Sequence, residues 1–175
     1  ETFGDMAFTL YSHAVSLRDL GCTQSPMNAW ITLNGVETLP LRMERHVENA
    51  QKVAGFLQQH PSVEWVSYAG LSSSPYYQLA QKYLQGKAGS VFTFGIRGGY
   101  ESGLRLLEKV ELFSHVSNIG DSRSLILHPA STTHRQLSDE QRLTAGAGPE
   151  VIRLSVGIES AEDLIADLEQ ALEGL

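Results

Sequence analysis

Hydrophobic residues recur every three or four positions in several stretches of the chain, which is the spacing of one face of an α-helix. The clearest stretch is 41–59, where Met43, Val47, Ala50 and Leu57 share a face and Asn49 falls among the polar positions. Further helices are predicted over 6–20, 76–84, 100–112, 138–143 and the residues that follow Ser160. Ser25, Ser138 and Ser160 stand where N-caps are expected.

The segment 28–39 has a different pattern, because it is apolar on most sides and contains Trp30, Ile31 and Leu33. A helix that is apolar all round needs burial between two bodies. Pro40 must then break or kink it. We therefore expect residues 1–40 to form a helical segment that packs on structure outside the chain.

Four stretches alternate with a period of two or are short and apolar, and we predict them as strands: 63–68, 91–96, 124–127 and 151–158. In the first, Val63, Trp65 and Ser67 should face one way. The order of helices and strands predicts an α/β (α+β) two-layer sandwich, with a small, mostly antiparallel sheet and helices packed on one face.

Composition narrows the function classes. The net charge of −7 argues against nucleic acid as a partner. The single cysteine, Cys22, excludes an internal disulfide, and no apolar run approaches the roughly 18 residues of a membrane span. Because the chain starts at Glu1 without an initiating Met or a signal peptide, we expect a cytoplasmic protein and a piece of a longer one.

Arg153 is the most informative candidate for chemistry. It lies on the predicted strand 151–158, on the face opposite Ile152 and Leu154, and small Ser155 and Gly157 flank it. Such neighbours would leave room for a ligand, and a guanidinium matches a carboxylate in bidentate fashion. The strand alone also fits a surface arginine that pairs with an acid of a helix, so both interpretations stay open.

Residues 117–124 form a dense polar stretch that could hold a small polar ligand or simply be a solvated loop. The spacing of His128 and His134 fits no known zinc motif. The glycine-rich stretches 95–99 and 146–149 lack phosphate-binding patterns, so we interpret them as turns. We find no convincing nucleophile or acid–base pair.

Several of these motifs together resemble the C-terminal domain of the Cys/Met-metabolism PLP-dependent enzymes. They are Asn118–His134, Val151–Glu159, Ser25-Pro26, Gly35–Leu39, Leu41–His46 with Asn49-Ala50, His60-Pro61 and Phe113–His115. Within this family, the stretch from Gly120-Asp121 to His134 is most similar to the O-acetylhomoserine sulfhydrylases. The cystathionine branches usually carry Gly-Gly in place of Gly120-Asp121.

The resemblance implies a fold-type I, aspartate-aminotransferase-like enzyme, of which this chain is the C-terminal portion. Such enzymes eliminate a γ-substituent from an amino-acid substrate and add sulfide or a thiol, here making homocysteine or methionine from O-acetylhomoserine. It further implies that residues 41–175 form the substrate-binding domain, in which Arg153 grips the substrate α-carboxylate and Ser117 and Asn118 line the same pocket.

The same resemblance implies that the full-length enzyme binds pyridoxal 5′-phosphate. It also implies that the Schiff-base lysine, the other cofactor-binding residues and the large domain that carries them are missing from this chain. We therefore expect this chain to bind no cofactor and to be inactive alone. The full enzyme would be a homo-oligomer, a dimer or tetramer. The alternatives are a cystathionine γ-lyase or γ-synthase, a methionine γ-lyase, or a stand-alone, non-catalytic binding module.

Overall fold

The computed structural model describes residues 4–175, and the chain divides into two compact units, Glu1–Pro40 and Leu41–Leu175. The division follows Pro40, but the helix interruption that the sequence predicts there lies at Thr38, and residues 39–40 are already helical.

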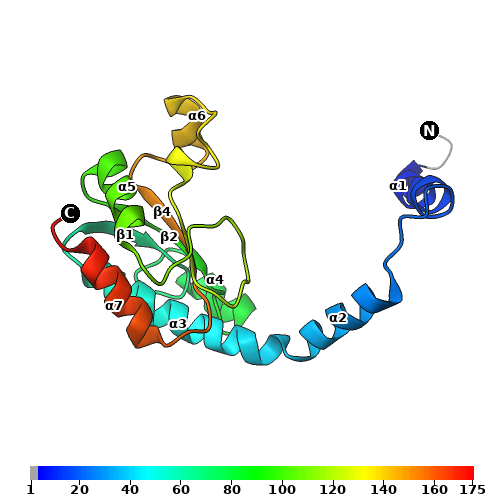
Figure 1. The fold of residues 1–175 in the computed structure, drawn as a ribbon, viewed down its shortest axis with the longest axis horizontal. Helices are drawn as coiled ribbons and strands as arrows, with labels where there is room; N and C mark the ends of the chain where they lie inside the picture. The colour runs from blue at the N-terminus through cyan, green and yellow to red at the C-terminus, as the bar shows by residue number, and fades with distance from the viewer. Residues whose placement is uncertain (1–3) are drawn as a thin grey trace. The chain divides into compact units, whose positions relative to one another are not determined.

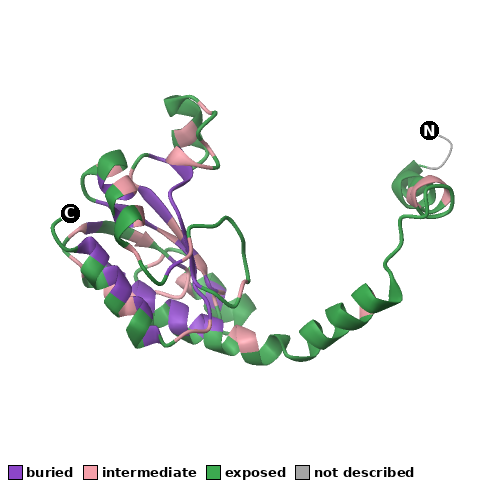
Figure 2. Ribbon diagram, viewed as in Figure 1, coloured by how far each residue is buried: buried purple, intermediate pink, exposed green. Residues whose placement is uncertain are grey.

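The first unit consists of short helices. Its elements are η1 (Gly4–Met6), α1 (Ala7–Tyr11), the π-helical η2 (Ser12–Leu17) and α2 (Pro26–Glu37). The predicted cap of α2 is confirmed, because the Ser25 hydroxyl accepts a hydrogen bond from the Asn28 N–H at 3.2 Å. Within this unit α2 has no buried residue, and Figure 2 shows most of it exposed. Its exposed apolar side chains include Met27, Trp30, Ile31, Leu33 and Val36.

The second unit begins inside α3 (Leu39–Gln59), which confirms the helix predicted over 41–59 and adds two residues at its start. Pro40 lies in the first turn, where its missing N–H leaves no intrahelical hydrogen bond unmade. The buried face includes Val47, Ala50 and Leu57, as the spacing predicts. Asn49 is also buried, so its assignment to a polar face was wrong.

Four strands form one antiparallel sheet in the order β1-β2-β4-β3. They are β1 (Val63–Ser67), β2 (Val91–Ile96), β3 (Leu125–Leu127) and β4 (Val151–Ser155). In the register, Arg153 of β4 lies between Thr93 of β2 and Leu127 of β3. β4 is three residues shorter than predicted, because the chain leaves the sheet after Ser155.

The faces predicted for the first strand were wrong in part. A bulge between Val63 and Trp65 interrupts the alternation, so Val63 joins the core with Tyr68 while Trp65 is exposed. The Trp65 indole lies over Gly95 of β2, where a Cβ would collide with the ring.

The remaining helices are α4 (Tyr77–Leu84), α5 (Gly99–Lys109), η3 (Pro129–Ser131), α6 (Asp139–Thr144) and α7 (Ala161–Leu172). Ser138 caps α6 in a capping box and Ser160 caps α7, as predicted. α5 ends at Lys109 rather than at residue 112, because the next backbone N–H groups bond to the Asp167 carboxylate instead of continuing the helix.

The two-layer architecture is confirmed. One face of the sheet packs on α3 and α7, with Leu106 of α5 in the same apolar cluster (Figure 1). Among the fully buried members are Phe94, Ile96, Ile152 and Leu154 from the sheet and Leu57, Leu164 and Leu168 from the helices. Because Ile152 and Leu154 point into this core, Arg153 must project from the opposite face of β4.

Candidate functional site

Arg153 stands on an interior strand and is half-buried. Its Nη2 lies 3.4 Å from the Ser117 hydroxyl oxygen, to which it donates a long hydrogen bond. No carboxylate within residues 4–175 comes within ion-pair distance of it, in contrast to Arg45, Arg123 and Arg142. Most of its five N–H donors are therefore left for another acceptor.

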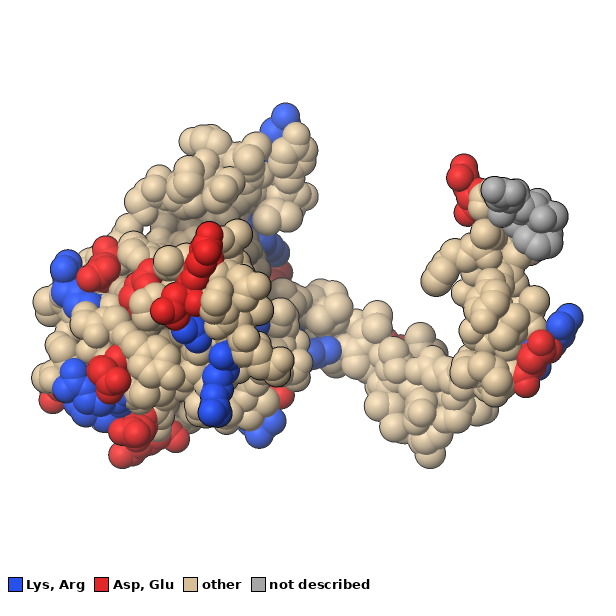
Figure 3. Space-filling view, turned by 90° about the horizontal axis from the view of Figure 1, so that it is seen from above, with Lys and Arg blue, Asp and Glu red and all other residues tan. Residues whose placement is uncertain are grey.

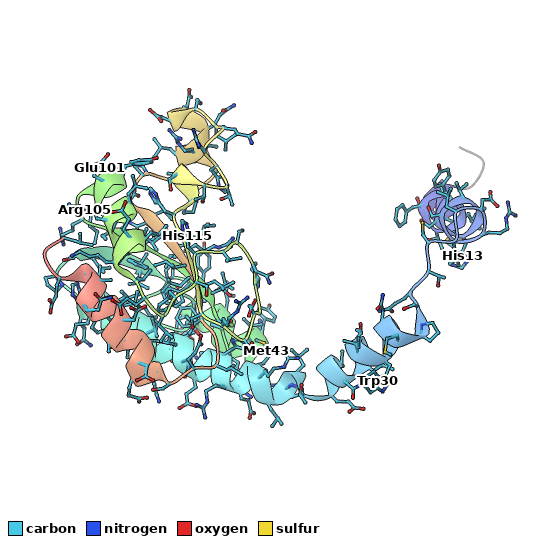
Figure 4. All side chains as sticks on the ribbon, in the orientation of Figure 1. His13, Trp30, Met43, Glu101, Arg105 and His115 are labelled. Carbon is cyan, nitrogen blue, oxygen red and sulfur yellow. The ribbon has the colours of Figure 1, made fainter. Side chains whose placement is uncertain are left out.

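The polar loop 115–123 provides the neighbour of Arg153. It connects the segment after α5 to β3, and His115, labelled in Figure 4, stands at its start. Ser117 and Asn118 are both exposed. The Asn118 side-chain oxygen accepts the N–H of Ile119 at 2.8 Å, so its recorded partner is within the loop. The structure thus brings Ser117 to Arg153, and it shows no hydrogen bond between Asn118 and that guanidinium.

The space expected beside Gly157 is filled by the chain itself, so this part of the sequence interpretation was wrong. A Cβ at Gly157 would collide with the Ser122 carbonyl oxygen and with the backbone of Arg123. The Ile158 N–H also donates to that Ser122 carbonyl at 2.9 Å. Gly157 is therefore needed for close approach of the loop, and an acceptor for Arg153 must come from another side.

Two polar groups that sequence analysis left without a role join this loop to the chain after β4. The Glu159 carboxylate accepts the Ser124 N–H at 2.7 Å with one oxygen and the Ser124 O–H at 2.9 Å with the other. The Ser124 hydroxyl in turn accepts the Gly157 N–H at 2.8 Å. Ser124 is fully buried.

Helix α3 supports the same segment from below the sheet. The buried Asn49 amide donates to the carbonyl oxygens of Gly157 at 3.1 Å and Glu159 at 2.8 Å. Nδ1 of buried His46 lies 2.6 Å from the Val156 carbonyl, which can only accept, so this nitrogen carries the proton. Ser124, Glu159, Asn49 and His46 all lie in the motifs that carry the family resemblance. Membership of those motifs was the only sequence signal for these four residues.

Charge around the loop is locally balanced. Asp121 accepts the backbone N–H of Arg123 at 3.0 Å and pairs with its guanidinium at 3.3 Å. The hydrogen bond from the Arg123 side chain is the main cause that lowers the pKa of Asp121. Figure 3 shows acidic and basic side chains interspersed over the second unit.

The two histidines of 128–134 have separate surroundings. His128 is fully buried, and its Nε2 donates to the Pro149 carbonyl at 2.9 Å while its Nδ1 lies 3.0 Å from the Ser131 hydroxyl. His134 is half-buried, and the hydroxyl of its exposed neighbour Thr133 lies 2.9 Å from its Nδ1. Within residues 4–175 no group of three histidine, cysteine or acidic residues could hold a metal ion.

Stability should fall in mild acid because of His128. Burial lowers the pKa of this imidazole, and the nearby His115 lowers it further, although the bond to the Pro149 carbonyl opposes both. The unfolded chain has the ordinary value of about 6.5. The contribution of the neutral His128 ring to the free energy of unfolding is therefore complete above about pH 6.5, and it is lost as the pH falls below that value toward the folded-state pKa.

This dependence can be measured by urea denaturation between neutral pH and about pH 5. Uptake of one proton changes the free energy of unfolding by at most about 1.4 kcal/mol per pH unit. NMR titration of the His128 ring should give a midpoint below that of a free histidine. A midpoint at or above the free value would contradict the assignment of a buried, neutral ring.

The lysines do not form a cofactor site in this chain. Lys52 pairs with Glu48, Lys87 with Glu44, Lys109 donates to the Glu173 carbonyl, and Lys82 lies over the Tyr83 ring. All four are exposed and engaged at the surface, and none hydrogen-bonds within the loop that holds Ser117. The residues present therefore do not fit a covalently held pyridoxal phosphate.

A separate hollow of about 390 Å³ lies beside α6. Its lining residues are Tyr100, Ala130, Asp139, Arg142, Leu143 and Pro149, and Arg153, Ser117 and Asn118 are not among them. None of the helices described over residues 4–175 is both long and apolar enough to span a membrane.

Comparison with known proteins gives consistent matches. The family model of the Cys/Met metabolism PLP-dependent enzymes matches residues 5–173. The chain is 51% identical to O-acetyl-L-homoserine sulfhydrylase 1 of Thermus thermophilus over 98% of its length, and 45% identical to the homocysteine synthase of Schizosaccharomyces pombe over 99%. A crystal structure from Campylobacter jejuni, named for an O-acetylhomoserine (thiol)-lyase and containing a pyridoxyl-lysine phosphate, matches with a TM-score of 0.87 and 46% identity over 95% of this chain.

The match covers only part of each relative. The chain spans 41% of the Thermus protein, 40% of the Schizosaccharomyces protein and 40% of the Campylobacter chain. The family model nevertheless extends over almost all of this sequence. The chain therefore belongs to the family of Cys/Met metabolism PLP-dependent enzymes.

Proposed function

We propose that this chain is the substrate-binding, C-terminal part of a PLP-dependent enzyme that makes homocysteine or methionine from O-acetylhomoserine and sulfide or a thiol. The observation that carries the proposal is Arg153, a half-buried arginine without an acidic partner among residues 4–175, which stands beside the Ser117 hydroxyl. The 51% identity to the sulfhydrylases of Thermus thermophilus and Leptospira meyeri favours this reaction over others of the family.

In this proposal the guanidinium of Arg153 binds the α-carboxylate of the amino-acid substrate through two parallel N–H···O bonds. Ser117 and Asn118 line the same side of the pocket and orient that carboxylate. Pyridoxal phosphate, when bound to the rest of the enzyme, supplies the electron sink for the reaction. The residues of this chain bind and orient the substrate.

We also propose that the two units of the chain have different roles. Residues 1–40 pack on the PLP-binding domain, which is supported by the exposed apolar side chains of α2, and residues 41–175 form the substrate-binding domain. The full enzyme is a homo-oligomer, a dimer or tetramer. We place it in the cytoplasm, in keeping with a free, exposed Cys22.

The test begins with the native polypeptide that carries this chain. Its intact mass should be about 2.5 times that of the chain, because the chain covers only 40–41% of these relatives. The purified protein should show the visible absorbance of bound pyridoxal phosphate. It should convert O-acetylhomoserine and sulfide to homocysteine, whereas the 175-residue chain alone should do neither.

Other substrates separate the alternatives. Release of cysteine from cystathionine would indicate a γ-lyase, use of cysteine as the acceptor would indicate a γ-synthase, and release of methanethiol from methionine would indicate a methionine γ-lyase. A native product of 19.2 kDa without the cofactor band would overturn the enzyme proposal and favour a stand-alone binding module.

A further inference from the structure

We propose that Glu159 is a positioning residue for the carboxylate site. Its side chain holds the end of the loop 115–123 against the chain that follows β4, and this fixes Ser117 beside Arg153. The geometry of the hold is independent of the reaction. Only the identity of the ligand that Arg153 receives rests on the proposed function.

The contact between Ser117 and Arg153 is too weak to place the loop. At 3.4 Å it is near the limit of a hydrogen bond, and both the guanidinium and the hydroxyl have access to water that can replace it. The position of Ser117 must therefore be set elsewhere.

Bonds inside the loop do not attach it to the sheet. Ile119 N–H donates to the Asn118 side chain, Arg123 N–H donates to Asp121, and Val116 N–H donates to the Ser114 carbonyl. These bonds shape the loop but leave it free to move as a unit. Its attachments are at its two ends.

The entry of the loop is attached by backbone alone. Ser114 forms an isolated parallel bridge with Leu125, with Ser114 N–H donating to the Ser124 carbonyl at 2.9 Å and Ile126 N–H donating to the Ser114 carbonyl at 3.0 Å. This attachment does not involve the side chain of Glu159.

The exit of the loop is attached by one backbone bond, from the Ile158 N–H to the Ser122 carbonyl at 2.9 Å, and by the side chain of Glu159. Both carboxylate oxygens of Glu159 are used on Ser124, at 2.7 and 2.9 Å, and no lysine or arginine among the described residues is within ion-pair distance of them. Bonds from a carboxylate to backbone and hydroxyl donors are charge-assisted and roughly twice as strong as neutral ones. The charge of Glu159 therefore serves to hold Ser124.

The other side of this attachment is rigid. Asn49 of the buried face of α3 binds the carbonyl oxygens of Gly157 and of Glu159 itself. Glu159 is thus anchored to a helix packed on the core, only six residues after Arg153 on the same chain. The exit of the loop and the strand that carries Arg153 are therefore both held in place by the same packed core.

Amide hydrogen exchange on the 175-residue chain tests the hold without any activity. In Glu159→Ala, the Ser124 amide and the Ile158 amide, which donates to the Ser122 carbonyl, should exchange at least about tenfold faster, the effect of losing about 1.4 kcal/mol of charged hydrogen bonding. Glu159→Gln keeps one acceptor oxygen and should lie between Ala and wild type. Glu169→Ala, which removes an exposed carboxylate from α7, is the matched control and should exchange like wild type.

Steady-state kinetics of the holoenzyme that carries this chain test the positioning. Glu159→Ala should raise KM for O-acetylhomoserine about tenfold and change kcat little, and Glu159→Gln should recover part of it. Simple loss of folded protein would lower kcat and leave KM unchanged. Gly157→Ala displaces the loop without removing charge, so it should give the same rise in KM.

Unchanged exchange of the Ser124 amide in Glu159→Ala, or an unchanged KM in an active enzyme, would overturn the positioning role. An inactive wild-type holoenzyme would instead contradict the proposed function, and the exchange result would still decide whether Glu159 holds the loop.

Discussion

Replacing Arg153 by alanine in the holoenzyme should raise KM for O-acetylhomoserine about 100-fold. The guanidinium would supply two charge-assisted bonds to the α-carboxylate, each worth roughly 1.5–3 kcal/mol, and about 1.4 kcal/mol corresponds to a factor of ten. Binding of the pyridoxal phosphate should be unaffected, because its visible absorbance depends on another part of the enzyme.

Two further variants sharpen this result. Arg153→Lys keeps the positive charge but loses the planar fork, so it should recover only part of the affinity. Arg105→Ala is a matched control, since this exposed arginine lies on α5 (Figure 4) and donates to Ser102 of the same helix. Steady-state kinetics and a titration with O-acetylhomoserine would measure both. A KM within about twofold of wild type for Arg153→Ala would contradict the carboxylate-binding role.

The secondary structure of this chain follows closely from local signals. Ser25, Ser138 and Ser160 each cap the helix that the sequence predicts after them. Such caps satisfy N–H groups within four residues, so sequence alone carries the information. The alternation around Arg153 likewise fixes its face, because Ile152 and Leu154 have to enter the core.

Long-range contacts explain what sequence could not predict. Asn49 is polar and was placed on a polar face, yet it is buried because it binds carbonyl oxygens more than 100 residues away. The space beside Gly157 suggested a ligand, but a loop from residues 122–123 fills it. A small residue on a strand shows that something approaches closely, without showing whether it is a ligand or the chain itself.

The candidate site has the same mixture of local and distant causes. The motifs that resemble the family contain Arg153, Ser124 and Glu159, and Ser117 lies directly before one of them, but the sequence does not show which of these residues touch. The pairing of Ser124 with Glu159 needs the register of β3 on β4 and the path of the chain after Ser155. Those are set by the folded sheet.

Asp167 should be the most important polar residue for stability. Its buried carboxylate accepts the backbone N–H groups of Glu111 at 2.8 Å, Leu112 at 2.9 Å and Phe113 at 3.1 Å. These groups follow the end of α5, where no helical partner remains for them. Asp167→Ala should lower the free energy of unfolding by about 3 kcal/mol, since it leaves three backbone donors without their acceptor, one of them on the buried Phe113.

Thermal and urea denaturation followed by circular dichroism would measure this loss, which corresponds to roughly 6–12 °C in Tm for a chain of this size. Asp167→Asn should recover little of the lost stability, because the amide nitrogen of asparagine would face a backbone N–H donor. Glu169→Ala, two residues further on α7 and exposed, should stay within about 0.5 kcal/mol of wild type. A similarly small effect for Asp167→Ala would show that water replaces the carboxylate.

The consequence of Asp167→Ala should extend to the candidate site. Phe113 is followed directly by Ser114, whose backbone bridge to Leu125 attaches the entry of the loop that carries Ser117. Loss of the carboxylate should therefore speed the exchange of the amides of residues 111–114, while the Glu159 attachment at the exit of the loop remains. Combining Asp167→Ala with Glu159→Ala should loosen both ends, and the fold rise in KM should then exceed the product of the two single fold rises.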